Sequence, residues 1–258
     1  MRDNPVKRTL LQGGVSMGVM CMEFASPGLG RVSAEGGADF AVFDMEHTGW
    51  SLETIKMLIA TSRASDLVPI IRPPVGDYHF IAHALDVGAM GLAIPLVGTA
   101  RQAREAVECA MYPPLGRRGC AFAMAHDDFK GGDIPAKMAH ANDNLLMIAQ
   151  IETEEGLRNL DEIAAVEGID ALWIGQFDLT VSMGIPGKFD HPKYLDATKR
   201  LLDACRRLRK IAVQGGPDPD LLAAAPAEGY GMIVYVADLW IYQRALRSCF
   251  KKIREKIG

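Results

Sequence analysis

Short apolar runs alternate with helical patterns along almost the whole chain. Eight of the runs are nearly continuous in apolar residues, which is typical of parallel strands covered on both faces. We predict strands at Val15–Glu23, Phe40–Asp44, Val68–Arg72, Gly91–Ile94, Leu145–Ile151, Ala171–Ile174, Ile211–Gln214 and Ile233–Val236. Apolar residues recur with helical spacing between these runs. We predict helices at Pro27–Glu35, Leu52–Arg63, His79–Val87, Ala100–Met111, Glu154–Val166, Pro192–Lys210, Pro219–Glu228 and Leu239–Lys256.

The number and order of these elements predict the fold. Strands that are each followed by a helix, repeated over 258 residues, are the arrangement of a (β/α)8 TIM barrel. A doubly wound sheet is the alternative, but such a sheet more often stops at about five or six strands. No linker divides the chain, so we expect a single domain over residues 1–258. The longest irregular stretch is Pro113–Asn144, and we expect it to serve mainly in assembly.

Composition narrows the class of protein. Hydrophobic residues make up 49% of the chain and charged residues 23%, and the net charge is −4 without basic blocks. Such a chain is an ordinary globular protein and a poor binder of nucleic acid or of a membrane surface. No apolar run approaches the roughly 18 to 20 residues of a membrane span. Five cysteines without a CxxC pair argue against disulfides or a cysteine zinc site and favour a reducing, cytoplasmic compartment.

Polar residues at the ends of the predicted strands carry the candidate chemistry. In barrels of this kind the active site lies at the carboxyl ends of the strands. The polar side chains that end or follow the second, third, fifth and sixth strands are Asp44, Glu46, His47, Arg72, Gln150, Glu152 and Asp178. We therefore expect these side chains to meet at one rim of the barrel.

Two of the carboxylates, Glu152 and Asp178, end neighbouring strands and form a candidate metal site. Adjacent strands lie about 4.8 Å apart. Carboxylates that close repel each other unless one is protonated or a cation lies between them. Oxygen ligands of this kind favour Mg²⁺ or Mn²⁺. The alternative is that both are rim acids paired with Arg72 or solvated, and the spacing alone leaves both interpretations open.

The remaining rim residues also have two interpretations each. His47 can act as a general base near neutral pH, or it can be a loop histidine satisfied by Asp44 or a backbone carbonyl. Arg72, before a stiff Pro-Pro pair, can bind a carboxylate or an oxyanion, or it can neutralise the rim acids. Asp178 falls at a predicted helix start, where backbone N–H groups can bind a small anion.

Other features predict less. His79 and His83 stand four residues apart on a predicted helix, but without a third ligand they indicate a helix surface or an interface. A Schiff-base mechanism needs a lysine inside the barrel near the carboxyl end of a strand. No lysine ends a predicted strand, and Lys210 precedes the seventh strand, so this route is disfavoured.

Six segments, in order, resemble the HpcH/HpaI aldolase family. They are Phe43–His47, Ile71–Pro74, Leu85–Gly91, Tyr112–Gly119, Gln150–Thr153 and Gly175–Thr180. The resemblance spans roughly residues 10 to 240 and implies a class II, pyruvate-specific aldolase acting on 4-hydroxy-2-oxo acids. The chain departs from the family pattern at Met111, where arginine is usual, at Gln176, and at the end of the last strand, Tyr235–Asp238.

The resemblance also implies roles for individual residues. It implies a barrel that holds Mg²⁺, Mn²⁺ or Co²⁺ on Glu152 and Asp178, and that commonly forms homohexamers whose subunits complete each other's sites. The catalytic residues that it implies are His47 as base, Arg72 as oxyanion stabiliser, Asp86 as assistant to the base and Asp44 as a second candidate for orienting it. The substrate contacts that it implies are Gln150 and the backbone amides around Phe177 and Asp178, which would hold the pyruvate carboxylate.

These expectations predict a metal-dependent carbon–carbon lyase that cleaves a 4-hydroxy-2-oxo acid reversibly to pyruvate and an aldehyde. One alternative is a lyase acting on a CoA thioester, like the citrate lyase relatives of the family, although no basic groove for CoA phosphates is evident. Another is a barrel that binds carboxylates without turnover, which would not need a base at His47. The sequence does not identify the aldehyde, the stereochemistry, the metal or the pathway.

Overall fold

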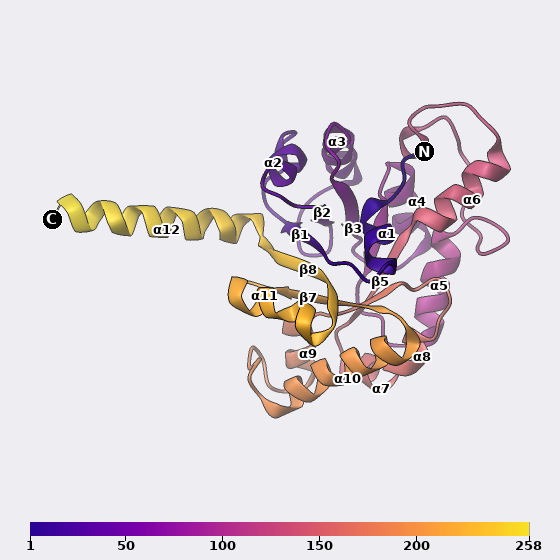
Figure 1. Cartoon of the computed structure of the whole chain (residues 1–258). Helices are drawn as coiled ribbons and strands as arrows, with labels where there is room; N and C mark the ends of the chain where they lie inside the picture. Colours follow the sequence, from indigo (N-terminus) through magenta and orange to yellow (C-terminus); the bar gives the residue numbers. More distant parts are fainter. Residues whose placement is uncertain (258) are drawn as a thin grey trace.

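The chain forms a closed barrel of eight parallel strands, paired in sequence order (Figure 1). The computed structural model describes residues 1–257. The strands are β1 (Ser16–Cys21), β2 (Phe40–Asp44), β3 (Val68–Arg72), β4 (Gly91–Ile94), β5 (Leu146–Ile151), β6 (Ala171–Ile174), β7 (Ile211–Gly216) and β8 (Tyr230–Ala237). The prediction of a (β/α)8 barrel is confirmed. The single-domain division over residues 1–258 stays a prediction, and Gly258 lies outside the described residues.

Helices follow the strands and cover the outside of the barrel. They are α1 (Pro5–Leu11), α2 (Leu29–Glu35), α3 (Leu52–Ser62), α4 (Tyr78–Asp86), α5 (Ala100–Ala110), α6 (Ile134–Asn144), α7 (Glu154–Arg158), α8 (Leu160–Ala164), α9 (Gln176–Ser182), α10 (Pro192–Leu208), α11 (Pro219–Glu228) and α12 (Asp238–Ile257). A short 3-10 turn, η1, spans Ala125–Asp127. Several helices begin at a side-chain cap, such as the reciprocal Thr99–Gln102 capping box of α5.

The core has two layers, because strands β2 to β6 are buried on both faces. Phe40, Val42 and Ile70 point into the barrel and pack with the other inward-facing residues. Phe43 and Ile71 point outward and pack against the helices. This double burial explains why the strands read as continuous apolar runs rather than as alternating ones.

Two helices differ from the sequence prediction. Helix α1 was not predicted; Val6 and Leu10 on it pack with the residues of the barrel interior, so α1 covers the amino-terminal end of the barrel. The prediction that Pro113–Asn144 is irregular was wrong over α6, which begins at an Asp133 cap with a proline in its first turn. In the same segment the buried Asp127 accepts hydrogen bonds from the backbone N–H groups of Ala123 and Met124.

The predicted boundaries were also wrong in detail. The predicted helix Glu154–Val166 is two short helices, α7 and α8, that meet at Asn159. The predicted strand Val15–Glu23 is shorter, at Ser16–Cys21, and β8 begins at Tyr230 rather than Ile233. Helix α9 follows β6 directly and begins at Gln176, which agrees with the predicted helix start at Asp178 to within two residues. The barrel topology is unaffected, because each change falls within one β–α unit.

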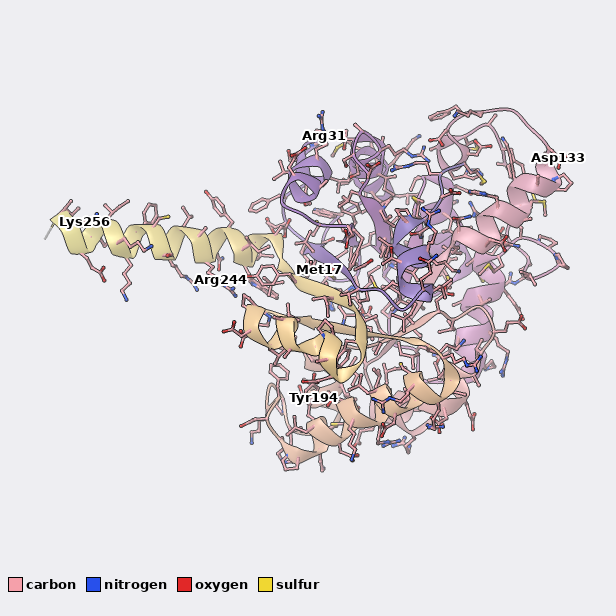
Figure 2. The ribbon with its side chains drawn as sticks, viewed as in Figure 1. Met17, Arg31, Asp133, Tyr194, Arg244 and Lys256 are labelled. Atoms are coloured by element: carbon pink, nitrogen blue, oxygen red, sulfur yellow. The ribbon has the colours of Figure 1, made fainter. Side chains whose placement is uncertain are left out.

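The last helix, α12, leaves the barrel and projects away from it (Figure 1). Asp238 at its root is its only buried residue among those described. Figure 2 shows Arg244 and Lys256 along this projecting helix. Aromatic and aliphatic side chains on it are exposed, including Trp240, Phe250 and Ile253.

An apolar side chain is also exposed on the barrel itself: Met17, on the outer face of β1, is 57% exposed. Across residues 1–257, no helix combines the length and the apolar character needed to cross a bilayer.

Candidate active site

The predicted rim exists, because the polar side chains follow strands whose carboxyl ends meet. Asp44 is the last residue of β2 and lies directly across from Arg72, the last residue of β3. Gln150 is the second-to-last residue of β5, and Glu152 follows that strand. Asp44, Arg72, Gln150 and Glu152 are all buried, at 0%, 7%, 1% and 2% exposure. Buried charges at one end of a barrel are costly unless they are paired, which makes this rim a candidate active site.

Asp44 and Arg72 form the structural centre of the rim. The Nε of Arg72 donates to Oδ1 of Asp44 over 2.7 Å. The Asp44 carboxylate also accepts the backbone N–H groups of Glu46, over 3.0 Å, and His47, over 3.2 Å. Burial opposes the charge on Arg72, but the hydrogen bond and the charge of Asp44 outweigh it and raise the pKa of the guanidinium. Arg72 therefore stays cationic, and Asp44 fixes the loop that carries His47.

The ring of His47 lies near Glu46 rather than Asp44. Oε2 of Glu46 is 3.8 Å from Nε2 of His47 and 3.2 Å from Nε of Arg72. This oxygen is buried and accepts no hydrogen bond from the described residues. Burial raises the pKa of Glu46, Arg72 opposes that shift, and Asp44 and Asp178 add to it. The orienting contact of Asp44 with His47 is thus made through the backbone of His47. Sequence analysis placed Glu46 at the rim but predicted no contact between its side chain and His47 or Arg72.

Glu152 is held by a backbone donor from the neighbouring strand. The N–H of Leu96, which follows β4 with a left-handed φ of 53°, donates to Oε2 of Glu152 over 2.6 Å. A Cβ at Gly175 would lie 2.1 Å from Oε1 of Glu152, so the carboxylate occupies space that only glycine leaves. Burial raises the pKa of Glu152 to about 7, the Leu96 hydrogen bond opposes this, and Glu46 and Asp178 reinforce it. Both contacts fix the carboxylate at the rim.

Asp178 and Phe177 lie in the first turn of α9, beyond Glu152. The cap residue of α9 is Gly175, which makes no side-chain hydrogen bond to the first turn. The backbone N–H groups of that turn are therefore free of a side-chain partner at the rim. Phe177 is 56% exposed and packs edge-to-face on Phe189, with ring centroids 5.2 Å apart.

The contacts of Gln150 and Asp86 are of different kinds. Oε1 of Gln150 is buried and has no hydrogen-bond partner among the described residues, as expected of a group that binds a ligand.

Asp86 is the last residue of α4. This helix runs from the carboxyl end of β3 back to the amino end of β4, so Asp86 lies at the other end of the barrel from His47. Its carboxylate is 2.8 Å from Nη2 of Arg118. The prediction that Asp86 assists the base stays a prediction, and it requires a second subunit.

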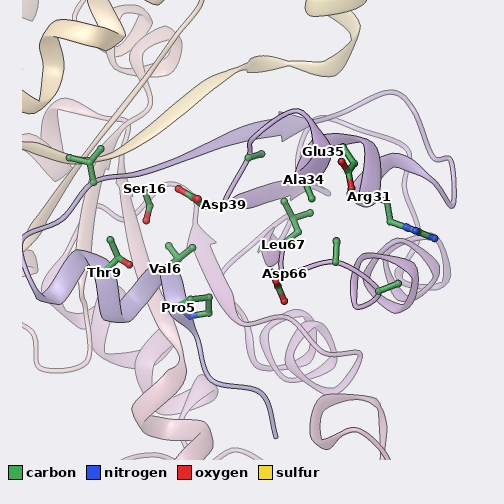
Figure 3. Close-up of a pocket in the computed structure, with 14 residues that line it drawn as sticks. Pro5, Val6, Thr9, Ser16, Arg31, Ala34, Glu35, Asp39, Asp66 and Leu67 are labelled. Carbon is green, nitrogen blue, oxygen red and sulfur yellow. The ribbon is translucent and has the colours of Figure 1, made fainter.

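A cavity of about 570 Å³ lies away from this rim (Figure 3). Its lining comes from α1, the start of β1, α2 and the connection into β3, including Val6, Ser16, Arg31 and Asp66. These elements meet at the amino ends of the strands. We assign the chemistry to the carboxyl rim, because the buried acids and Arg72 are there.

Within residues 1–257, no three or more His, Cys, Asp or Glu side chains are arranged to hold a metal ion by themselves. The rim offers two acids of suitable chemistry, Glu152 and Asp178.

Two sets of side chains that the sequence analysis placed outside the active site lie away from the rim. His79 and His83 are exposed on α4, with ring centroids 6.2 Å apart. Lys210 donates to the backbone carbonyls of Val166 and Ile169 near the amino end of β7, away from the rim.

Comparisons with known proteins agree with this geometry. The model of the HpcH/HpaI aldolase/citrate lyase family matches residues 19–215. A 2-keto-3-deoxy-L-rhamnonate aldolase from Klebsiella pneumoniae is 33% identical over 246 residues, covering 94% of this chain and 90% of that protein. An HpcH/HpaI aldolase of known structure from Desulfitobacterium hafniense superposes with a TM-score of 0.94 at 29% identity, covering 98% of both chains. The citrate synthase SbnG superposes with a TM-score of 0.88 at 26% identity, covering 97% of both chains. The chain belongs to the HpcH/HpaI aldolase/citrate lyase family and is a carbon–carbon lyase of the aldolase type.

Proposed function

We propose that this enzyme cleaves a 4-hydroxy-2-oxo acid reversibly to pyruvate and an aldehyde. The observation that carries the proposal is the meeting of a buried cationic Arg72, an exposed His47 and the acids Glu152 and Asp178 at one rim. The named activity of the Klebsiella relative supports a sugar-derived 2-oxo acid such as 2-keto-3-deoxy-L-rhamnonate as one substrate to test.

The residues of the rim fit a divalent cation. Burial raises the pKa of Glu152 and of Glu46, and the nearby charge of Asp178 adds to both shifts, so a cation at the rim would stabilise the charged carboxylates. Their oxygen atoms are the ligands that Mg²⁺, Mn²⁺ and Co²⁺ accept, with substrate and water oxygens completing the shell. We propose that Glu152 and Asp178 hold the ion. When bound, it would supply Lewis-acid stabilisation of the negative charge on the keto oxygen of the 2-oxo acid.

The chain's own groups account for the proton and the substrate contacts. His47, at 49% side-chain exposure, is accessible to remove the proton of the C4 hydroxyl. The C3–C4 bond then breaks, the aldehyde leaves, and the electron pair stays on the three-carbon fragment, which takes up a proton at C3 from His47 or water to become pyruvate. Arg72 uses Nε for Asp44, which leaves its terminal Nη groups to donate to the developing oxyanion. Gln150 and the amides of Phe177 and Asp178 would bind the carboxylate of the 2-oxo acid. In the synthetic direction His47 returns the proton.

An assay of pyruvate release over a panel of 4-hydroxy-2-oxo acids tests this proposal. We expect turnover with Mg²⁺ or Mn²⁺, its loss with EDTA and its return on adding the metal. Activity that survives complete chelation would contradict the metal assignment. Trapping of a pyruvate adduct by borohydride would instead indicate a lysine mechanism.

A second candidate is condensation or cleavage at a citrate-type substrate, including a CoA-thioester lyase. The similarity to the citrate synthase SbnG favours testing it. Turnover of citrate or of a CoA thioester, without pyruvate release from any hydroxy-oxo acid, would select this candidate. A barrel that only binds carboxylates would show neither activity.

We also propose a homo-oligomer, such as a hexamer, in the cytoplasm. Helix α12 exposes Trp240, Phe250 and Ile253 with no element of its own chain over them, which supports contact with another subunit. The described cysteines form no disulfide, which supports a reducing compartment. Light scattering of the purified protein gives the number of subunits, and a monomer at micromolar concentration would contradict the assembly proposal.

A further inference from the structure

A small cavity at the amino-terminal end of the barrel gathers buried groups that have no partner. It has a volume of about 50 Å³ and lies between the start of the chain, the end of α4, the segment after α5, and α6. Its lining includes Arg2, Arg118, His126 and His140 among apolar side chains such as Leu85. It is separate from the active site, which lies at the carboxyl rim.

The unpartnered atoms are concentrated here. In residues 1–257, seven buried side-chain nitrogen or oxygen atoms make no hydrogen bond, and four of them belong to residues of this cavity. They are Nη1 of Arg2, Nε of Arg118 and both ring nitrogens of His126. A guanidinium nitrogen can only donate, and a buried donor without an acceptor destabilises the fold. Arg118 and His126 are themselves 5% and 9% exposed.

The charges around the cavity leave a positive balance. Arg118 is paired with Asp86 through Nη2, over 2.8 Å. Arg2 donates through Nη2 to the backbone carbonyl of Ser65 and has no carboxylate within 4.0 Å among the described residues. Arg63, close by, is paired with Asp128 over 3.3 Å. The guanidinium of Arg2 is therefore the lining cation that no acidic side chain neutralises.

We propose that this cavity binds a small inorganic anion of the size of chloride, held by Nη1 of Arg2 and Nε of Arg118. An anion can accept hydrogen bonds from both donors and also neutralise the positive charge of Arg2. A water molecule can accept the same hydrogen bonds, but it leaves that charge without a partner. A volume of about 50 Å³ holds one such ion with a water molecule, and it is too small for a ligand with an organic skeleton. His126 would donate the N–H of its neutral ring to the ion.

The surroundings of His126 agree with this electrostatic picture. Its pKa is lowered first by burial and then by the positive charge of Arg118 and, more weakly, of Arg63. Asp127 and Asp86 oppose the shift without cancelling it. An anion in the cavity would join the start of the chain to η1 and the segment before it, and so stabilise the amino-terminal end of the barrel.

Thermal unfolding in matched salts tests the proposal. We compare the Tm in chloride with that in gluconate, an anion too large for the cavity, at equal ionic strength and pH. Chloride is expected to raise the Tm with the logarithm of 1 + [chloride]/Kd, by about 3 °C at ten times its Kd. Equal Tm values in the two salts, or a rise that is linear in chloride concentration instead of logarithmic, would overturn the proposal. Stabilisation by phosphate but not by chloride or bromide would also overturn it.

Two variants and one control locate the effect. Arg2→Gln and His126→Phe are expected to lose the chloride-dependent part of the Tm. Arg2 is chosen because its side chain donates to the backbone carbonyl of Ser65 and, among the described residues, to no side chain. Arg117→Gln is the control, because Arg117 is exposed and contacts Cys109 and the ring of Tyr78 instead of the cavity. The opposite pattern, in which Arg2→Gln keeps the response and Arg117→Gln loses it, would refute the site.

A bromide-soaked crystal gives an independent measurement that does not depend on the folding of a variant. An anomalous peak within hydrogen-bond distance of Nη1 of Arg2 and Nε of Arg118 supports the site. No peak there at a bromide concentration at least about ten times the Kd obtained from the Tm response overturns it.

Discussion

At the scale of single residues, the rim depends on side chains that do two things at once. The carboxylate of Asp44 accepts a hydrogen bond from the Arg72 guanidinium, and it also accepts hydrogen bonds from the backbone N–H groups of Glu46 and His47. The Glu152 carboxylate lies against Gly175, which follows the next strand, β6, and accepts the N–H of Leu96, which follows the previous strand, β4. Such shared contacts place the catalytic groups without long side chains, since each strand end is itself rigid.

The first prediction concerns His47. His47→Ala removes the proposed base, so kcat for pyruvate release should fall by about 10² to 10⁴ fold. The affinity for pyruvate should change little, because the contacts that we propose for its carboxylate lie on α9 and β5. Steady-state kinetics and a pyruvate titration measure the two effects. His79→Ala, on the exposed face of α4, is the matched control and should behave as wild type; a kcat of His47→Ala near the wild-type value would contradict the role.

The second prediction concerns Gly175. A Cβ at this position would meet Oε1 of Glu152 at 2.1 Å, and the carboxylate would have to move. Gly175→Ala should therefore weaken Mn²⁺ binding and lower kcat/KM by at least about tenfold, because small misplacements of catalytic groups are costly. Gly131→Ala, where a Cβ meets nothing within 4 Å, is the control. Calorimetric titration with Mn²⁺ decides the matter, and unchanged affinity in Gly175→Ala would show that Glu152 does not hold the ion.

At the scale of elements, the β1–α2 connection is fastened to the root of α12. The buried carboxylate of Asp238 accepts the backbone N–H groups of Met22, Glu23 and Phe24. It also accepts the N–H of Leu239, the next residue of its own helix. Phe24 packs edge-to-face on Tyr242, with centroids 5.6 Å apart. The loop at the mouth of the barrel and the projecting helix are therefore one connected unit.

The third prediction follows from that connection. Asp238→Ala leaves four buried or half-buried backbone donors without their acceptor, so it should lower the free energy of unfolding by about 2 to 4 kcal/mol. Urea unfolding measures this loss. Asp196→Ala, at an exposed position of α10, should change it by less than about 0.5 kcal/mol. A similar small change in both variants would mean that the loop is held by other contacts.

The eight strands and most helices could be predicted from the sequence, because parallel strands buried on both faces give continuous apolar runs. The residues Asp44, Arg72 and Glu152 could be found for the same reason, since each ends or follows such a run. The contact of Leu96 with Glu152 could not, because it uses a backbone N–H and a left-handed φ that leave no mark on the residue type. The seven-residue helix α1 was missed because its burial depends on a distant barrel end rather than on local periodicity.

At the scale of the whole molecule, chemistry and stability are divided between the two ends of the barrel. The carboxyl rim holds the acids, Arg72 and His47, and the amino end holds α1, the small cavity and His126. His126 is buried, and its pKa is lowered from the ordinary value of 6.5, chiefly by burial. Protonation of His126 is therefore less favourable in the folded chain than in the unfolded chain, and it lowers the free energy of unfolding.

The fourth prediction is the pH dependence that results. Below about pH 6.5 the unfolded chain takes up a proton that folded His126 resists, so the free energy of unfolding falls until the folded histidine is protonated too. Above pH 6.5 the full stability is present. The charged groups facing His126 are Arg118, Arg63, Asp127 and Asp86. His126→Phe in gluconate buffer should show a shallower loss of stability between pH 6.5 and 5 (about one and a half pH units); parallel curves for variant and wild type would contradict this.

The most direct test of the proposed chemistry does not require knowledge of the aldehyde. An enzyme that cleaves the C3–C4 bond toward pyruvate must stabilise negative charge at C3 of pyruvate, and it should therefore exchange the methyl protons of pyruvate with D₂O. Proton NMR of pyruvate with the enzyme and Mg²⁺ should show the methyl signal disappearing, and EDTA should stop the loss. A methyl signal that persists at the rate of the enzyme-free control would contradict the proposed reaction, and exchange that continues in EDTA would contradict the role of the metal.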